Sequence, residues 1–194
     1  MGKAIATYNE QAVTYEVNGE QVSLDFPFVR QYIVRGRADY VTDAELMMFL
    51  HTCKAAKLNP LIGGEVHLIK YSKDEAAQIV VGKYAYLKRA YENPAYCGKK
   101  DGIVVQRGNE IICKEGTCLY PNESLIGGWC RVSVQRNGVV TEEYKEVALS
   151  EYNKGQASWK SKPATMISKV AISQAIRDAF PEQYEGIYSE EEMV

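Results

Sequence analysis

The sequence predicts an α+β fold, in which a short antiparallel β-sheet is packed with helices, and two observations lead to it. The Asn-Gly pairs Asn18-Gly19 and Asn137-Gly138 each separate segments that alternate apolar and polar residues, which is the pattern of a β-hairpin with a type I′ turn. Apolar residues also recur at helical spacing, most clearly in residues 43–57 and 163–180. Strand pairs and helices that are segregated along a chain are typical of the α+β class.

The first hairpin is expected over about residues 12–26. A short helix from Phe26 to Arg35 follows, because Asp25 suits its N-cap, Pro27 suits its first turn and Gly36 suits its end.

A longer helix is expected over residues 43–57, since Thr42 and Glu45 have the spacing of a capping box. Asn59-Pro60 stops it. Residues 65–71 and 76–82 then alternate as strands. The predicted core face of the long helix consists of Leu46, Phe49, Leu50 and Cys53.

The middle of the chain predicts a short helix and then an antiparallel sheet of three to five strands. Residues 101–120 turn at Gly108-Asn109, and residues 127–147 turn at Asn137-Gly138. The helix, residues 83–93, has Tyr84, Leu87 and Tyr91 on one side, and Lys83, Lys88 and Arg89 around the other.

Composition favours a soluble cytoplasmic protein. The chain has 194 residues, of which 46% are hydrophobic and 25% charged, and no apolar run approaches the roughly 18 residues that span a bilayer. The start of the chain lacks the pattern of a secretory signal. The five cysteines are odd in number and lack C-x-x-C spacing, so we expect reduced thiols and no bound metal or cofactor.

Charge is distributed unevenly, although the net charge is only −2. Residues 154–177 hold five basic residues and no acid, residues 83–107 hold six basic residues against two acids, and residues 178–194 hold six acids and no base. A polyanion responds to local potential, so the two basic zones are candidate contacts for nucleic acid.

We expect a single domain, residues 1–181, followed by an acidic tail, residues 182–194.

The basic segment that begins at Ser158 predicts a helix with two faces. Pro163 suits its first turn, and Met166, Val170 and Phe180 belong to an apolar face. The other side carries residues within an arc of roughly 120°, which either form a solvated surface or hold phosphates. These polar residues are Lys162, Thr165, Lys169, Ser173 and Arg177.

Trp159 has two readings on the sequence alone. Beside Lys160 and Lys162, it either stacks on a base while the lysines hold phosphates, or covers the core where the loop meets the helix.

The sequence gives little support for an enzyme, because neither His51 nor His67 lies in a recognisable nucleophile motif. The alternatives that stay open are a small metal-dependent nuclease or hydrolase, and a passive single-strand binding protein.

Three segments resemble the phage recombination protein Bet, that is, the Red beta and RecT family of single-strand annealing proteins. They are DAELMMFLHTCKAAKLNPLIGGEVHLIKY, IVVGKYAYLKRAY and SWKSKPATMISKVAISQAIRDAFPEQYEGIYSEEE. The resemblance implies an α+β core that is not an enzyme. It implies ATP-independent binding and annealing of single-stranded DNA by a homo-oligomer, as a ring or filament. It also implies a phage exonuclease as partner, a location in the bacterial host cytoplasm, and an effect of Mg²⁺ on annealing without a structural site.

Carried over by position, the resemblance implies DNA contacts for Lys169, Arg177 and Trp159, and for the basic residue Arg35. Lys83, Lys88 and Arg89 are further candidates. Two departures matter. Ala164 follows Pro163 where relatives often carry a basic residue, so Lys160 or Lys162 is expected to replace it. The chain also stops soon after the Gly-Ile-Tyr segment, which leaves exonuclease recruitment open.

Overall fold

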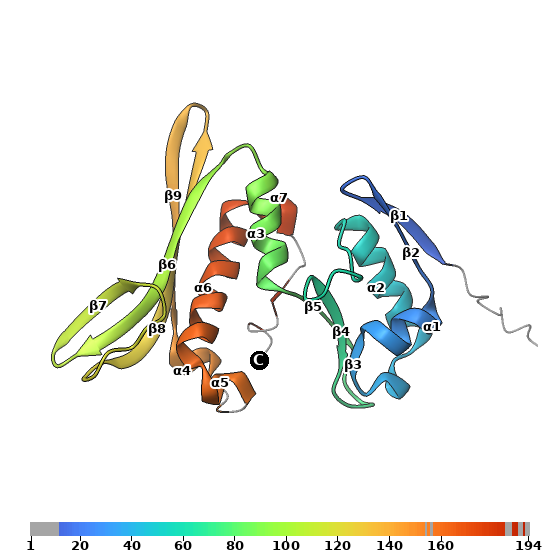
Figure 1. Cartoon of the computed structure of the whole chain (residues 1–194), viewed down its shortest axis with the longest axis horizontal. Helices are drawn as coiled ribbons and strands as arrows, with labels where there is room; N and C mark the ends of the chain where they lie inside the picture. Colours follow the sequence, from blue (N-terminus) through green and yellow to red (C-terminus); the bar gives the residue numbers. More distant parts are fainter. Residues whose placement is uncertain (1–11, 154, 156, 185–187, 190–191, 193–194) are drawn as a thin grey trace, which may run out of the picture. The chain divides into compact units, whose positions relative to one another are not determined.

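The structure is a computed structural model that describes residues 12–153, 155, 157–184, 188–189 and 192 (Figure 1). The chain forms two compact units, unit 1 (residues 1–80) and unit 2 (residues 81–194), and each is described by itself. Both units combine helices with strands, so the predicted α+β class is confirmed.

Unit 1 contains a hairpin, a three-stranded sheet and one long helix. The hairpin turns at Asn18 and Gly19, whose positive φ angles of 52° and 81° fit a type I′ turn, so this prediction is confirmed. The sheet has the order β3-β4-β5, with β3 and β4 parallel. The elements are β1 (Val13–Val17), β2 (Glu20–Leu24), α1 (Phe26–Phe28), the π-helical turn η1 (Val29–Ile33), β3 (Val34–Gly36), the 3₁₀ turn η2 (Ala38–Tyr40), α2 (Asp43–Ala55), β4 (Val66–Lys70) and β5 (Gln78–Val81), which ends at the unit boundary.

The helix predicted from Phe26 to Arg35 is correct at its start and wrong at its end. Asp25 caps it as expected, because its carboxylate accepts a hydrogen bond of 2.8 Å from the backbone N–H of Phe28. The helical turns end at Ile33, and the chain continues as β3, which pairs with β4. Pairing with a distant strand outweighs the local helix signal, so Arg35 lies on a strand.

The first turn of α2 is tied to the sheet of unit 1. Thr42 and Glu45 form the predicted capping box, and the Glu45 carboxylate also accepts hydrogen bonds of 2.7 Å from Lys70 Nζ and from the Ala77 N–H. Burial alone would raise the pKa of Glu45, but the hydrogen bonds outweigh it and lower that pKa to about 2. The predicted core face is confirmed, and the helix ends at Ala55, two residues earlier than expected.

Unit 2 is built on a four-stranded antiparallel sheet of order β7-β6-β8-β9, which confirms the predicted sheet. The predicted turns are also confirmed, with positive φ at Gly108, Asn137 and Gly138. The elements are α3 (Lys83–Glu92), β6 (Tyr96–Arg107), β7 (Glu110–Glu115), β8 (Ser124–Arg136), β9 (Val139–Ala148), α4 (Leu149–Tyr152), α5 (Ala157–Ser161), α6 (Pro163–Ala179) and α7 (Pro181–Tyr184).

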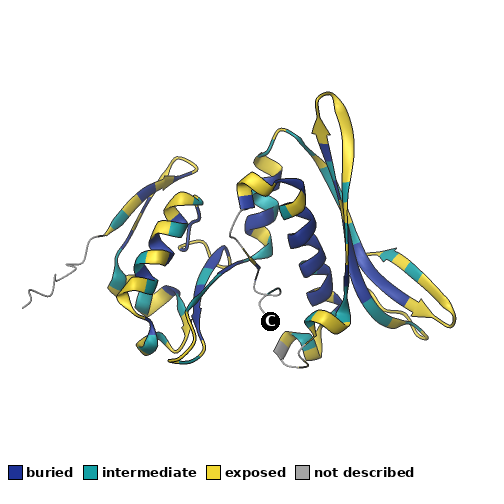
Figure 2. Cartoon of the chain, turned by 180° about the vertical axis from the view of Figure 1, so that it is seen from behind, coloured by how far each residue is buried: buried dark blue, intermediate teal, exposed yellow. Residues whose placement is uncertain are grey.

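Helix α6 is the centre of unit 2. It packs against β8 and β9 of the sheet and against α3, and Figure 2 shows its length as almost continuously buried. Gly128 on β8 permits the close approach, since a Cβ atom there would lie 2.7 Å from the carbonyl oxygen of Ile167. The sheet therefore fixes the position of α6, and α6 fixes that of α3.

The end of the chain packs on the same unit. Helix α7 crosses the boundary predicted at residue 181, and its Tyr184 is buried and stacks on Tyr86 of α3, with ring centroids 5.1 Å apart. Ser189 forms a parallel β-bridge with Val81. The described residues of the predicted acidic tail thus contribute to unit 2, while the predicted domain boundary itself stays a prediction.

Candidate nucleic-acid interface

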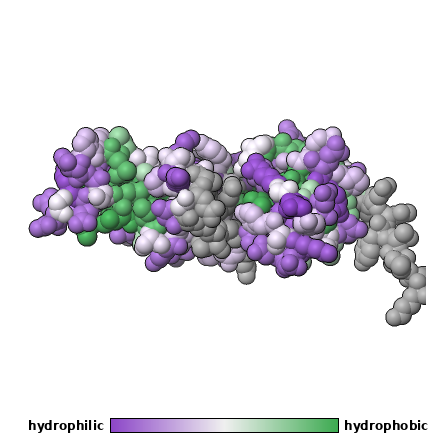
Figure 3. All heavy atoms as spheres, turned by 90° about the horizontal axis from the view of Figure 1, so that it is seen from below, coloured by the Kyte–Doolittle hydropathy of each residue, from purple (hydrophilic) through white to green (hydrophobic). Residues whose placement is uncertain are grey.

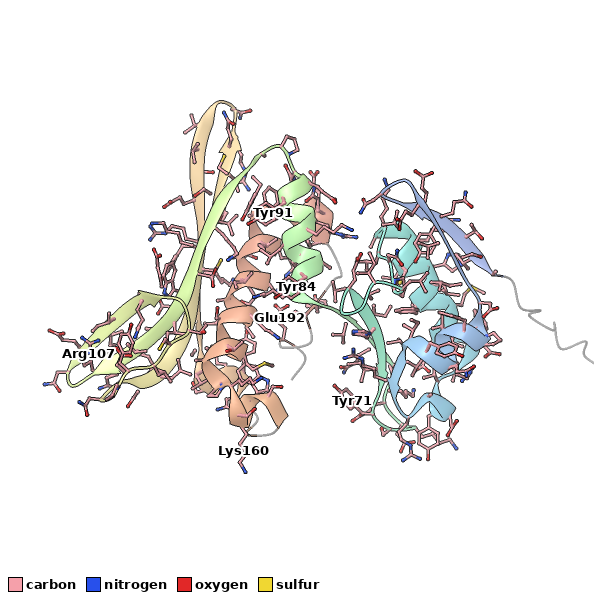
Figure 4. The ribbon with its side chains drawn as sticks, viewed as in Figure 1. Tyr71, Tyr84, Tyr91, Arg107, Lys160 and Glu192 are labelled. Atoms are coloured by element: carbon pink, nitrogen blue, oxygen red, sulfur yellow. The ribbon has the colours of Figure 1, made fainter. Side chains whose placement is uncertain are left out.

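The predicted basic segment forms two consecutive helices, α5 and α6. Pro163 occupies the first turn of α6, as predicted. Lys162 is the N-cap residue, and its side chain makes no capping hydrogen bond. Lys160 and Lys162 are exposed, and Figure 4 shows Lys160 pointing away from the body of unit 2. Trp159 is partly buried, and its stacking role stays a prediction. This junction presents two lysines to solvent.

The predicted polar stripe of α6 is interrupted. Thr165 is exposed and Lys169 is partly exposed, but Ser173 is fully buried, so the expectation that Ser173 lies on an accessible stripe is wrong. The physical reason is that two layers cover α6, the sheet on one side and α3 on the other. A helix between two layers buries more than the single face that its apolar periodicity indicates.

Arg177, at the other end of the stripe, is bound by a carboxylate. Its guanidinium donates to both oxygens of Glu192, at 2.6 Å and 3.1 Å, and lies 5.1 Å from the ring centroid of Tyr188. Burial would lower the pKa of Arg177, but the ion pair with Glu192 outweighs it, and the net shift is upward. Glu192 also accepts a hydrogen bond of 2.9 Å from the Ser189 N–H. The bidentate geometry is the one that arginine also uses for phosphate.

Helix α3 carries the second predicted basic zone. Lys83, Lys88 and Arg89 are partly exposed, and Arg89 donates to the carbonyl oxygen of Gln183 at 3.2 Å. The buried residues of α3 are Ala85, Tyr86 and Ala90, whereas Tyr84 and Tyr91 face solvent. The sequence interpretation grouped these two tyrosines but did not identify them as exposed. The alanines at positions 85 and 90 were the available signal, because small residues allow helices to pack closely.

Arg35 belongs to unit 1, and the other predicted contact residues belong to unit 2. Arg35 is exposed on β3. Burial lowers the pKa of His67 on β4, and the charge of Arg35 lowers it further. Gly36 has a φ of 82°, and a Cβ atom there would clash with the Lys70 carbonyl oxygen, so this glycine lets the end of β3 approach β4.

Metal-ligand clusters and membrane-spanning helices are both absent from the part of the chain that the structure describes. Among the described residues, no group of three or more His, Cys, Asp and Glu side chains is placed to hold a metal ion. No helix among them is long and apolar enough to cross a membrane. In Figure 3, hydrophilic residues cover much of the face seen, and a band of hydrophobic residues crosses unit 2 just inside its hydrophilic end at the left of the view.

A basic, partly aromatic surface on an α+β fold is the kind that nucleic-acid-binding proteins carry. A family model described as the RecT family matches residues 27–194. A curated but uncharacterized protein of Ureaplasma parvum serovar 3 is 30% identical over 128 residues, which is 66% of this chain and 50% of that protein. The chain therefore spans about half the length of this curated relative. Because the family match covers most of the sequence, the chain belongs to the RecT family.

Proposed function

We propose that this protein binds single-stranded DNA and anneals complementary strands in phage homologous recombination, without ATP and without cutting DNA. The observation that carries the proposal is membership of the RecT family over residues 27–194. The exposed lysines at the α5–α6 junction and the basic residues of α3 support it.

The proposed chemistry is electrostatic. Lys160, Lys162 and Lys169 hold phosphates, together with Lys83 and Lys88 of α3, and each contact releases a counterion. The affinity for single strands should then fall with salt, with a slope of roughly −0.7 per phosphate contact. Because these contacts are made to the backbone, the base edges stay available to a complementary strand.

Arg177 joins this set in exchange for an internal partner. We propose that a DNA phosphate replaces the Glu192 carboxylate on the guanidinium, because both ligands take the same bidentate geometry. The acidic end of the chain then competes with DNA for Arg177. Arg89, Thr165 and Arg35 are proposed as additional phosphate contacts.

The assembly and its partners extend the proposal. We propose a homo-oligomer, a ring or filament, in which neighbouring subunits share one DNA path, which makes binding cooperative. A phage exonuclease would supply the single strand in the cytoplasm of the bacterial host. No cofactor is required, and Mg²⁺ acts on annealing by screening the two strands.

The deciding experiment mixes two complementary strands that carry a donor and an acceptor fluorophore. With the protein and without ATP, we expect pairing to be faster than spontaneous pairing, and both strands to keep their full length in Mg²⁺. Coating of the strands without faster pairing would indicate a passive binding protein, and shortened strands would indicate a nuclease. Particle imaging of the same samples tests the ring or filament.

A further inference from the structure

Helix α3 exposes two aromatic rings on one face. Tyr84 is 76% exposed and Tyr91 is 69% exposed, and Figure 4 shows them toward the two ends of this helix. Seven residues separate them, which is close to two full turns, so the rings lie on the same side, about 10 Å apart along the helix axis. Tyr86 of the same helix is fully buried, so one tyrosine of α3 belongs to the core while the other two face solvent.

The surroundings of the two rings are cationic. Lys83 Nζ lies 5.4 Å from the ring centroid of Tyr84, within the range of a cation–π contact. Lys88 lies one turn beyond Tyr84, between the two tyrosines on the same side of the helix, so the expected placement of Lys88 on the opposite side is wrong. The Tyr91 ring is held edge-on against Tyr96, with centroids 5.0 Å apart and planes at 71°. Flat rings alternate here with positive charges.

We propose that Tyr84 and Tyr91 form a base-stacking platform for single-stranded DNA, with Lys83 and Lys88 at the adjoining phosphates. The proposal rests on the proposed function and adds a contact with the bases to the phosphate contacts. Tyrosine rings stack on any base because every base has an aromatic face, so the platform needs no sequence. The spacing of about 10 Å corresponds to roughly three base steps of 3.4 Å, which lets one strand reach both rings.

The platform favours the single strand over the annealed product. Bases in a duplex are already stacked and paired, and stacking them on a protein ring requires unstacking energy. Tyr84 and Tyr91 therefore hold an unpaired strand and lose their contact as that strand pairs. An interface with an acidic protein would also match the lysines, but it would not depend on nucleobases. Base dependence is the property that the test must isolate.

The test compares two strands with equal numbers of phosphates. One is a labelled oligonucleotide of thymidines, and the other is an abasic oligonucleotide of the same length. Fluorescence anisotropy gives the affinity of the full chain for each, at one fixed salt concentration. We expect Tyr84→Ala and Tyr91→Ala each to weaken binding of the thymidine strand about tenfold. Binding of the abasic strand should not change.

Matched variants separate stacking from other effects. Tyr84→Phe and Tyr91→Phe keep the ring and should retain the wild-type affinity for the thymidine strand. Tyr32→Ala removes another exposed tyrosine, 65% exposed on η1 of unit 1, and should leave both affinities unchanged. Circular dichroism with thermal unfolding shows whether each variant keeps the wild-type fold, which we expect because both rings are exposed.

The outcomes are distinct from those of the proposed function. If the wild-type chain does not bind the thymidine strand, the proposed function fails and the platform fails with it. If the wild type binds and anneals but the alanine variants bind both strands normally, only the platform is overturned. Equal losses on the thymidine and abasic strands, or a base-dependent loss in Tyr32→Ala, would also overturn it. Base-specific loss in the α3 variants, with rescue by phenylalanine, supports it.

Discussion

Helices α3 and α6 pack against each other in unit 2, yet they use their residues in opposite ways. Twelve of the 17 residues of α6 are buried, since the sheet covers one side and α3 the other. Helix α3 buries Ala85, Tyr86 and Ala90 and turns its other side to solvent. Both helices carry predicted DNA contacts. On α6 these residues are surrounded by buried neighbours, whereas on α3 they lie on a side that faces solvent.

This difference indicates where a substitution can change DNA binding without changing the stability of the fold. In α6 a proposed phosphate contact such as Lys169 lies next to core residues, and Arg177 is itself part of a largely buried ion pair. Substitutions in α6 are therefore expected to change stability, with or without a change in binding. In α3 the lysines and the exposed Tyr84 lie outside the core, and the exposed Tyr91 makes only an edge contact with Tyr96. Substitutions there should therefore change binding with little effect on stability. Five predictions test this contrast.

The largest effect is expected in the core of α6. Ile167 is fully buried where α6 meets β8, so Ile167→Ala removes buried surface and leaves a cavity. We expect the free energy of unfolding to fall by about 2–5 kcal/mol, measured by urea denaturation. Tyr84→Ala in α3 is the matched control and should change it by less than about 0.5 kcal/mol. Equal losses in the two variants would contradict the contrast between the helices.

The next effect concerns the ion pair at the end of α6. Arg177→Ala leaves the Glu192 carboxylate, only 6% exposed, without its cation. We expect a loss of about 2 kcal/mol in the free energy of unfolding, reduced from a fully buried pair because Arg177 keeps some exposure. Binding of every single-stranded sequence should weaken alike.

Glu192→Gln tests the same pair from the other side. Glutamine keeps the shape of the side chain and removes its charge, so the guanidinium is easier for a phosphate to reach. We expect tighter binding of single strands and a salt slope that is more negative by up to about 0.7. Unchanged affinity and slope, measured by anisotropy at several salt concentrations, would show that DNA does not displace Glu192.

Much of the fold could be predicted because its signals are local. The turns at Asn18-Gly19 and Asn137-Gly138 need positive φ, and the Thr42 capping box needs only residues within one turn. The end of the first helix could not be predicted in this way. Val34 and Arg35 continue as a strand because they pair with β4, more than 30 residues later. Pairing of this kind leaves no mark in the short segment itself.

The same distinction, between features with local causes and features that depend on tertiary packing, applies to the candidate site. Lys160 and Lys162 are exposed, as expected for charged side chains just before the helix that begins at Pro163. Neither the burial of Ser173 nor the pairing of Arg177 could be predicted, because both depend on which elements cover α6. The exposure of Tyr84 has the same cause, since only tertiary packing decides which side of α3 meets α6.

A smaller effect is expected from the lysines of α3. Replacing Lys83 and Lys88 together by glutamine should leave the free energy of unfolding within about 0.5 kcal/mol of wild type, because neither residue is part of the core. The salt slope for single-strand binding should become less negative by about 1.4, which corresponds to two phosphate contacts. Lys54→Gln with Lys57→Gln in unit 1 is a control with the same change of charge. An equal change of slope in that control would mean that only total charge matters.

The smallest effect separates two hydroxyl groups on α6. The Ser173 hydroxyl is buried and has no hydrogen-bond partner among the described residues, whereas Thr165 is exposed in the first turn of the helix. Ser173→Ala removes a buried polar group that is not compensated, so we expect stability to stay the same or rise by up to about 1 kcal/mol. Binding of single-stranded DNA by this variant should not change.

Thr165→Ala should leave stability intact and weaken DNA binding by about 0.5–1.5 kcal/mol if its hydroxyl donates to a phosphate. Urea midpoints and anisotropy measure both quantities. Weaker DNA binding by Ser173→Ala at unchanged stability would mean that DNA reaches a residue which α3 and the sheet cover, so that α6 must be uncovered when the strand binds.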